Sequence, residues 1–281
     1  MKVLLTGCNG FIGTEFSEYF KNSNYEIYSM SRRTLDVSVA KQVDDFFNNN
    51  VIDVVVHAAV EGGARETPST LDDLISNLAM FSNLRKHSDK YKMMINLCSG
   101  AAFDRRKNIS RFKEEEIEFC YPEDYYGLSK NVIAKEICYE ESNLVNFRLF
   151  GCFGAREKNT RLIKNCINNL MNNDPMIIHQ DREMDFFYVK DLFVVMKYYI
   201  ENFNNLLPKD VNMSYQQKMS LFDIVDFLKK TLNKEKVGTI MQSPVRGLSY
   251  SGSGERLKAL RLNLVGLEAG IVEVCEELGI A

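Results

Sequence analysis

Residues 6–13 read Thr-Gly-Cys-Asn-Gly-Phe-Ile-Gly, and this loop directly follows the apolar run Lys2–Thr6 near the start of the chain. Gly7 permits a tight turn, Gly10 lets the backbone approach a pyrophosphate, and Gly13 lets the following helix pack close to the strand. The N-terminus of that helix offers free N–H groups and a partial positive charge to phosphate. The loop therefore predicts a dinucleotide site rather than a purely structural glycine turn. The residues expected to contact the cofactor there are Gly7, Asn9, Gly10, Phe11, Ile12 and Gly13.

The sequence around this loop alternates between short β-branched runs and stretches with helical spacing. The expected strands are Lys2–Thr6, Glu26–Met30, Asp53–His57, Met93–Leu97 and Val145–Leu149. The expected helices are Thr14–Lys21, Val39–Asn48, Ser69–His87 and Tyr126–Ser142. Strands that alternate with helices predict an α/β fold, a doubly wound parallel sheet with helices on both faces.

After Phe150 helical runs dominate, with short apolar strands between them. We expect residues 1–150 to form the dinucleotide-binding domain. Residues 151–281 are expected to form a smaller α+β region that binds the substrate and is interleaved with the first. The charged run Lys113–Glu116 is expected to be the solvated face of a loop.

The composition excludes several classes of protein. Of 281 residues, 45% are hydrophobic and 26% are charged, which excludes a disordered chain. The net charge of -3 implies no broad positive surface for nucleic acid, and no stretch approaches the roughly 20 apolar residues of a membrane span. The seven cysteines are scattered and the three histidines lie far apart, so we expect a reduced, cytoplasmic protein without a metal site.

The end of the second expected strand bears on the choice of cofactor. An enzyme that uses NAD usually has Asp or Glu there to bind the adenosine ribose, but residues 28–33 read Tyr-Ser-Met-Ser-Arg-Arg. A planar guanidinium is well suited to a 2′-phosphate. We therefore expect NADP(H), bound here by Ser31, Arg32 and Arg33. Asp36 is placed to accept from the adenine amino group. The alternative is that the two arginines are merely solvent-exposed side chains at the end of a strand.

A tyrosine and a lysine at helical spacing form the centre of the predicted catalytic site. Tyr126 and Lys130 are four residues apart, so both lie on one face of a helix. A free tyrosine has a pKa of about 10, and a neighbouring ammonium lowers it. Tyr126 can then protonate the oxygen of a carbonyl that receives hydride. Ser99, at the end of an apolar strand, can donate to the same oxygen. Asn77, in the intervening helix, joins the cofactor-binding set as a polar side chain able to bind backbone or water.

Several motifs together resemble the extended short-chain dehydrogenase/reductase superfamily, which includes the NAD-dependent epimerases and dehydratases of sugar nucleotides. Within it, Ala58–Gly63 (Ala-Ala-Val-Glu-Gly-Gly) is similar to the GDP-fucose synthase branch. The resemblance implies an N-terminal Rossmann domain for NADP and a C-terminal domain for a nucleotide-activated sugar. The motifs span nearly the whole chain: residues 6–13, His57-Ala58-Ala59, Ser99, Tyr126 with Lys130, residues 148–154 and residues 185–192.

The resemblance also assigns roles to single residues. Lys130 would hold the nicotinamide ribose, and Ala58 and Ala59 would line the cofactor. The arginine that typically meets the nucleotide diphosphate in this superfamily is replaced by Met184, and Arg182 and Arg246 are candidates to share its role. The residues expected to bind the substrate are Glu61, Arg161, Arg182 and Arg246.

Two departures from the family pattern refine the expected reaction. GDP-fucose synthases epimerise with a cysteine and a histidine as acid and base, where this chain has Ala101 and, in an ungapped alignment, Arg161. Neither side chain exchanges a carbon-bound proton at neutral pH. The segment Ser99–Ala101 also lacks the acid pair of the 4,6-dehydratases. We therefore expect NADPH-dependent reduction of the 4-keto group of a nucleotide-activated deoxysugar, without epimerisation at C3 or C5.

Two other functions stay open. A C4 epimerase that uses bound NAD is disfavoured by the missing acid at the second strand, and a non-catalytic NADP-binding sensor is disfavoured by the intact Ser, Tyr and Lys set. We also expect a homodimer, because helices beside the site often form a two-fold interface in this superfamily. The apolar residues expected there are Leu74, Leu78, Phe81, Ile133 and Ile137.

Overall fold

The computed structural model describes residues 1–64, 67–139 and 143–280. The chain divides into two compact units. The first unit comprises Met1–Arg105, Lys113–Leu149 and Val195–Asn212, and the second comprises Arg106–Phe112, Phe150–Val194 and Met213–Ala281. Each unit thus contains segments from both sides of residue 150.

A six-stranded sheet forms the centre of the first unit, in the order β10-β6-β4-β3-β1-β2. Neighbouring strands from β6 to β2 run parallel. The chain order reverses at β1, which has β2 on one side and β3 on the other, and ligands of doubly wound sheets bind at such a switch point. The expected doubly wound α/β fold is confirmed. The strands are β1 (Lys2–Thr6), β2 (Glu26–Met30), β3 (Val54–His57), β4 (Met93–Ser99), β6 (Leu144–Leu149) and β10 (Asp210–Met213).

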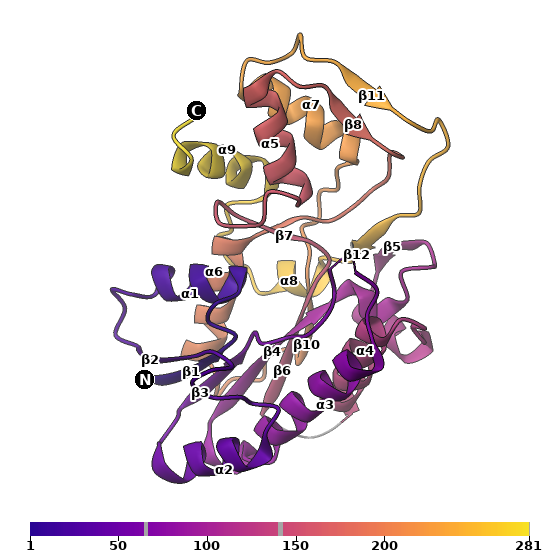
Figure 1. The fold of residues 1–281 in the computed structure, drawn as a ribbon. Helices are drawn as coiled ribbons and strands as arrows, with labels where there is room; N and C mark the ends of the chain where they lie inside the picture. Colours follow the sequence, from indigo (N-terminus) through magenta and orange to yellow (C-terminus); the bar gives the residue numbers. More distant parts are fainter. Residues whose placement is uncertain (65–66, 140–142, 281) are drawn as a thin grey trace. The chain divides into compact units, whose positions relative to one another are not determined.

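Three helices cover one face of this sheet through a shared apolar core. The core joins inward-facing residues of the strands, such as Leu4 and Val55, to helix residues such as Phe47, Phe81 and Ile137. Figure 1 shows α2, α3 and α4 along this face and α1 on the opposite one. The helices are α1 (Phe11–Tyr19), α2 (Ala40–Asn49), α3 (Leu71–Arg85) and α4 (Tyr125–Tyr139), with short 3-10 helices η1 (Ser88–Lys90), η2 (Gly100–Phe103) and η3 (Glu114–Phe119).

A buried polar network joins the last strand of the sheet to its neighbours. Nδ2 of Asn96 donates to Oδ1 of Asn146 at 2.7 Å, and Nδ2 of Asn146 donates to Oδ1 of Asp210 at 2.7 Å. Arg148, which is 0% exposed, donates to Asp210 at 2.7 Å and to Asn212 at 2.9 Å. A buried charge needs a partner to offset its desolvation, so β10 supplies the carboxylate that β6 requires.

The second unit contains three small parallel strand pairs and several helices. α6 begins in this unit and ends in the first. The paired strands are β5 (Ile109–Phe112) with β12 (Tyr250–Gly252), β7 (Cys152–Phe153) with β9 (Phe187–Tyr188), and β8 (Met176–Ile178) with β11 (Thr239–Met241). The helices are α5 (Leu162–Asn172), α6 (Val189–Glu201), α7 (Leu221–Thr231), α8 (Glu255–Ala259) and α9 (Leu267–Glu277).

Two expectations from the sequence are wrong in detail. Phe81, Ile133 and Ile137 are at most 1% exposed and pack against the sheet, so they are not available for a dimer interface. The run Lys113–Glu116 is not simply a solvated loop: η3 begins within it, and Glu114 is 3% exposed and accepts from the backbone N–H of Asn212 at 2.8 Å.

No helix among the described residues is long and apolar enough to cross a membrane.

Candidate active site

The glycine-rich loop joins β1 to α1 at the switch point of the sheet. Gly7 has a φ of +70°, and a Cβ there would lie 2.6 Å from the backbone nitrogen of Ala59, so no larger residue fits. Gly10 is the N-cap of α1 and offers no side chain to its N–H groups, and the first turn of the helix has no acidic residue. These features suit a pyrophosphate, which needs close backbone approach and free N–H donors.

His57 ends β3 beside this loop and is 3% exposed. Oγ1 of Thr6 accepts from the backbone N–H of Ala59 at 3.2 Å and lies 2.9 Å from Nδ1 of His57. Burial lowers the pKa of His57 to about 3, and the charge of Lys130 acts in the same direction. Such a histidine does not act as a base at neutral pH.

Ser99, Tyr126 and Lys130 all belong to the first unit. Nζ of Lys130 lies 6.0 Å from the centroid of the Tyr126 ring and donates to the carbonyl oxygen of Leu97 at 2.8 Å. Lys130 is 4% exposed, and burial lowers its pKa. Ser99 ends β4, and its hydroxyl oxygen accepts from the backbone N–H of Ala101 at 3.2 Å.

Close packing brings the start of α4 against the turn that follows Ser99. A Cβ on Gly127 would lie 2.9 Å from the carbonyl oxygen of Ala101. Gly127 follows Tyr126, so this packing places the tyrosine next to η2. The start of α4, which carries Tyr126 and Lys130, therefore lies against the turn that follows Ser99 at the end of β4.

A two-glycine turn covers the ring of Tyr126. Gly63 has a φ of +82°, and a Cβ there would lie 2.7 Å from a ring carbon of Tyr126. Asn77, which is 3% exposed, fixes the turn: its Oδ1 accepts from the N–H of Glu61 at 2.9 Å, and its Nδ2 donates to the carbonyl of Glu61 at 3.0 Å. The same Nδ2 lies 3.2 Å from Oγ of Ser129 on α4. Asn77 therefore joins the turn to the helix that carries Tyr126.

A pocket of about 480 Å³ opens in the first unit next to Tyr126. Arg105 lies with its guanidinium carbon 5.8 Å from the Tyr126 ring centroid and pairs with Asp124 at 2.9 Å. Asp124 also accepts from the N–H of Gly127 at 2.8 Å, as expected of a residue that caps a helix. The pocket is lined by Gly63, Ala64, Thr67, Pro68, Ser69, Arg105, Glu123, Asp124 and Tyr125. Sequence reasoning did not select Arg105 or Asp124; the only available signal was an aspartate just before a helix.

At the end of β2, the predicted 2′-phosphate site contains carboxylates as well as arginine. Nη2 of Arg32 lies 2.5 Å from Oε1 of Glu61, and its Nε lies 3.7 Å from Oδ2 of Asp36. Oδ1 of Asp36 accepts from the hydroxyl of Ser38 at 2.6 Å. Arg33 is exposed. Glu61, expected on the substrate side, therefore lies beside a residue expected to bind the cofactor.

Arg182, a predicted substrate residue, lies in a tightly fixed part of the second unit. Its carbonyl accepts from the N–H of Leu221 at 3.0 Å, and Gly247 donates to the neighbouring carbonyl of Asp181 at 2.8 Å. A Cβ on Gly247 would lie 3.5 Å from Cδ of Arg182. The structure therefore brings Arg182 to the turn that contains Arg246.

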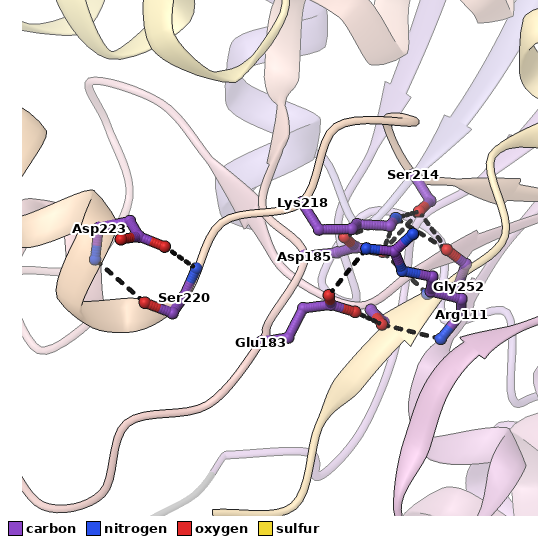
Figure 2. Close-up of polar contacts among 9 residues, drawn as sticks. Arg111, Glu183, Asp185, Ser214, Lys218, Ser220, Asp223 and Gly252 are labelled. Carbon is purple, nitrogen blue, oxygen red and sulfur yellow. Dashed lines mark hydrogen bonds and ion pairs between the residues drawn. The ribbon is translucent and has the colours of Figure 1, made fainter. Parts of the chain in front are cut away.

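A buried ion pair and its neighbours fix this region (Figure 2). Asp185 accepts from Nζ of Lys218 at 2.8 and 3.0 Å, from Ser214 at 2.5 Å and from the N–H of Gly252 at 2.8 Å. Burial raises the pKa of Asp185, and the charge of Lys218 opposes this. The neighbouring Glu183 accepts from Ser251 at 2.6 Å and from Arg111 at 3.3 Å.

Arg161 lies elsewhere in the second unit, at the N-cap of α5. Its Nε is 3.9 Å from Oε2 of Glu157, whose side chain is 3% exposed. Burial raises the pKa of Glu157 to about 7, although Arg161 and Lys164 lower it. No contact within the described residues joins Arg161 to Arg182 or Arg246. The sequence gives no signal for a buried carboxyl group at Glu157.

A doubly wound sheet with a glycine-rich phosphate loop at its switch point defines a Rossmann-type dinucleotide-binding protein. Residues 3–214 match the NAD dependent epimerase/dehydratase family. The chain belongs to this family.

Known proteins similar to this chain include enzymes of sugar-nucleotide metabolism. GDP-L-colitose synthase of Yersinia pseudotuberculosis is 23% identical over 302 residues, covering 98% of this chain and 97% of that protein. GDP-mannoheptose C4 reductase from Campylobacter jejuni with NADP bound has a TM-score of 0.78 and 17% identity, covering 99% of this chain and 98% of that one. A dTDP-4-dehydrorhamnose reductase from Clostridium acetobutylicum has a TM-score of 0.81 and 19% identity, covering 99% and 100%. At these identities the two solved structures establish the fold alone.

Proposed function

We propose that this protein is an NADPH-dependent reductase of the 4-keto group of a nucleotide-activated deoxysugar. The observation that carries the proposal is the packing of Tyr126 and Lys130 beside the turn after Ser99, next to a pocket of about 480 Å³. The names of the similar proteins support it, since they include a GDP-mannoheptose C4 reductase and a dTDP-4-dehydrorhamnose reductase.

In this proposal the glycine-rich loop and Arg32 would hold NADPH, which when bound would supply the hydride for the carbonyl carbon. The phenol of Tyr126 donates its proton to the carbonyl oxygen. The hydroxyl of Ser99 donates a hydrogen bond to the same oxygen and polarises the carbonyl. Lys130 stabilises the phenolate that remains, because a cation near a phenol favours its ionised form.

Reduction without epimerisation follows from the residue at position 101. Ala101 is 0% exposed and carries no titratable group, so it cannot take a proton from a sugar carbon. Arg161 has a permanent charge and pairs with Glu157 at 3.9 Å. Neither residue supplies the acid and base that C3 or C5 epimerisation requires.

The second unit supplies the proposed nucleotide-binding residues. Arg182 and the turn containing Arg246 offer two guanidinium groups for a diphosphate, which arginine binds well. Arg161 is the third basic candidate. The pairing of Glu61 with Arg32 makes Glu61 a better candidate for the cofactor than for the sugar. We also propose a cytoplasmic homodimer; exposed apolar residues on α3 and α4 that could contribute are Leu71, Ile75, Val132 and Tyr139.

The proposal is tested by mixing the protein with NADPH and a panel of 4-keto-6-deoxy sugars carrying GDP, CDP or dTDP. We expect NADPH absorbance to fall and a 4-hydroxy product to appear with at least one of them. Binding of NADPH without reduction of any panel member would support the sensor alternative. In a parallel incubation with NAD and the corresponding 4-hydroxy sugar nucleotides, interconversion of C4 epimers would support the epimerase alternative.

A further inference from the structure

The structure brings an acid to the end of β2, where the sequence has none. Residues 28–33 contain no Asp or Glu, yet Oε1 of Glu61, from the segment after β3, lies 2.5 Å from Nη2 of Arg32. In doubly wound folds an acid at this place accepts a hydrogen bond from the adenosine ribose 2′-hydroxyl, and an arginine accommodates a 2′-phosphate. Both kinds of side chain therefore stand at one site and neutralise each other.

The position of Glu61 is determined by a buried side chain rather than by the ion pair. Asn77 bonds to both the N–H and the carbonyl of Glu61, at 2.9 and 3.0 Å, and is itself 3% exposed. The ion pair is open to solvent, with side chains of Arg32 and Glu61 that are 59% and 35% exposed. Such a pair adds little to stability. Arg32 and Glu61 can consequently give up their contact with each other and bind groups of a ligand instead.

We propose that Glu61 is a specificity-determining residue that limits the preference for NADP(H) over NAD(H). With NAD(H), the Glu61 carboxylate accepts from the ribose 2′-hydroxyl. With NADP(H), the 2′-phosphate must take Arg32 from Glu61 and lie near a like charge. The carboxylate thus favours one cofactor and opposes the other. This inference rests on the cofactor assignment within the proposed function and not on the sugar substrate.

The test measures dissociation constants of NADPH and NADH by calorimetry, without a sugar substrate. Glu61→Gln should tighten NADPH about three- to fivefold, because the competing exposed ion pair is weak. It should weaken NADH about three- to tenfold, because a hydrogen bond to a charged acceptor is lost. Glu26→Gln is the matched control: it removes one exposed carboxylate from the other end of β2, 3.9 Å from Lys2. It should change both constants less than about twofold.

A second pair of variants separates competition for Arg32 from the overall charge. In an Arg32→Gln background, Glu61→Gln should tighten NADPH by a smaller factor than in the wild type, because there is no guanidinium to release. The inference is overturned if Glu61→Gln leaves the ratio of the NADPH and NADH dissociation constants within twofold of the wild-type ratio. It is also overturned if Glu61→Gln tightens NADPH by as large a factor in the Arg32→Gln background as in the wild type. Failure of the wild type to bind either dinucleotide overturns this inference and the proposed function together. Binding of both without turnover of any sugar overturns only the reductase proposal.

Discussion

The ammonium of Lys130 donates to the carbonyl of Leu97 at 2.8 Å, two residues before Ser99. This bond ties α4 directly to β4 and, together with the packing of Gly127 on Ala101, sets the spacing between the helix with the phenol and the strand with the hydroxyl. The position of the lysine therefore does not depend on the hydroxyl of Tyr126.

Tyr126→Phe should lower turnover by about 100-fold or more, since general acid catalysis typically contributes about 100- to 10,000-fold. The affinity for NADPH should change little, because Lys130 keeps its bond to Leu97. Steady-state kinetics and direct binding measure the two quantities separately. Retention of turnover within tenfold would show that another group protonates the carbonyl.

Gly63→Ala should disturb the ring of Tyr126. The new Cβ would lie 2.7 Å from a ring carbon, at a φ of +82°. We expect the free energy of unfolding to fall by about 1–3 kcal/mol and turnover to fall with it. Gly238→Ala is the control, because nothing lies within 4 Å of its Cβ position and its φ is ordinary. Chemical denaturation of both variants measures their free energies of unfolding. A loss of stability in Gly63→Ala alone shows a local clash with Tyr126, whereas an equal loss in both shows a general effect of replacing glycine by alanine.

Arg32→Ala combined with Arg33→Ala should remove most of the preference for NADPH. We expect the wild type to bind NADPH at least about tenfold more tightly than NADH, a difference of about 1.4 kcal/mol. The arginines bind the additional phosphate by charge, so NADH affinity should stay nearly constant. Equal affinities in the wild type would refute the cofactor assignment.

Reduction in deuterated water should place no deuterium at C3 or C5 of the sugar. Ala101 has no titratable group, and Arg161 stays protonated. Mass spectrometry and NMR of the product report the label directly. Deuterium at either carbon would reveal a base elsewhere in the chain and contradict the assignment of a simple reductase.

Glu157 should make stability depend on pH between about 4.5 and 7. Burial raises the pKa of this carboxyl from 4.5 to about 7 in the folded state. The stabilisation of the folded state by protonated Glu157 is therefore fully present below pH 4.5, the pKa of the group in the unfolded chain. This stabilisation is lost as the pH rises through 7, on the order of 3 kcal/mol in all. Glu157→Gln should flatten this part of the profile, as measured by denaturant unfolding at several pH values. An unchanged slope would show that the pKa of Glu157 is not raised in the folded protein.

The strands of the sheet differ in how well the sequence predicts them. Runs such as Val54–His57 are continuous and apolar, and the sequence predicts the positions of these strands correctly. The sequence does not predict β10 (Asp210–Met213), because alternate residues of this strand are polar. Those residues are buried all the same, because Arg148 and Asn146 need them as partners. A pattern of hydropathy cannot show that two polar groups satisfy each other.

The site shows a similar division between local and tertiary information. The spacing of Tyr126 and Lys130 and the glycines after β1 are local signals, and sequence reasoning finds them. The pairing of Arg32 with Glu61 joins segments 29 residues apart and depends on the buried Asn77. Helical spacing alone also does not tell whether Phe81 and Ile137 face the sheet or a second subunit, and the structure places them against the sheet.

The bond between Arg148 and Asp210 has a consequence for the order in which the chain is synthesised and folded. A nascent chain that has emerged only to residue 150 carries the guanidinium of Arg148 without its carboxylate, and leaving such a group buried and unpaired costs about 3–5 kcal/mol. We therefore expect β6 to be stably buried in the sheet only after residues 210–213 have left the ribosome. Residues 150–194 of the second unit therefore leave the ribosome before the first unit can be completed.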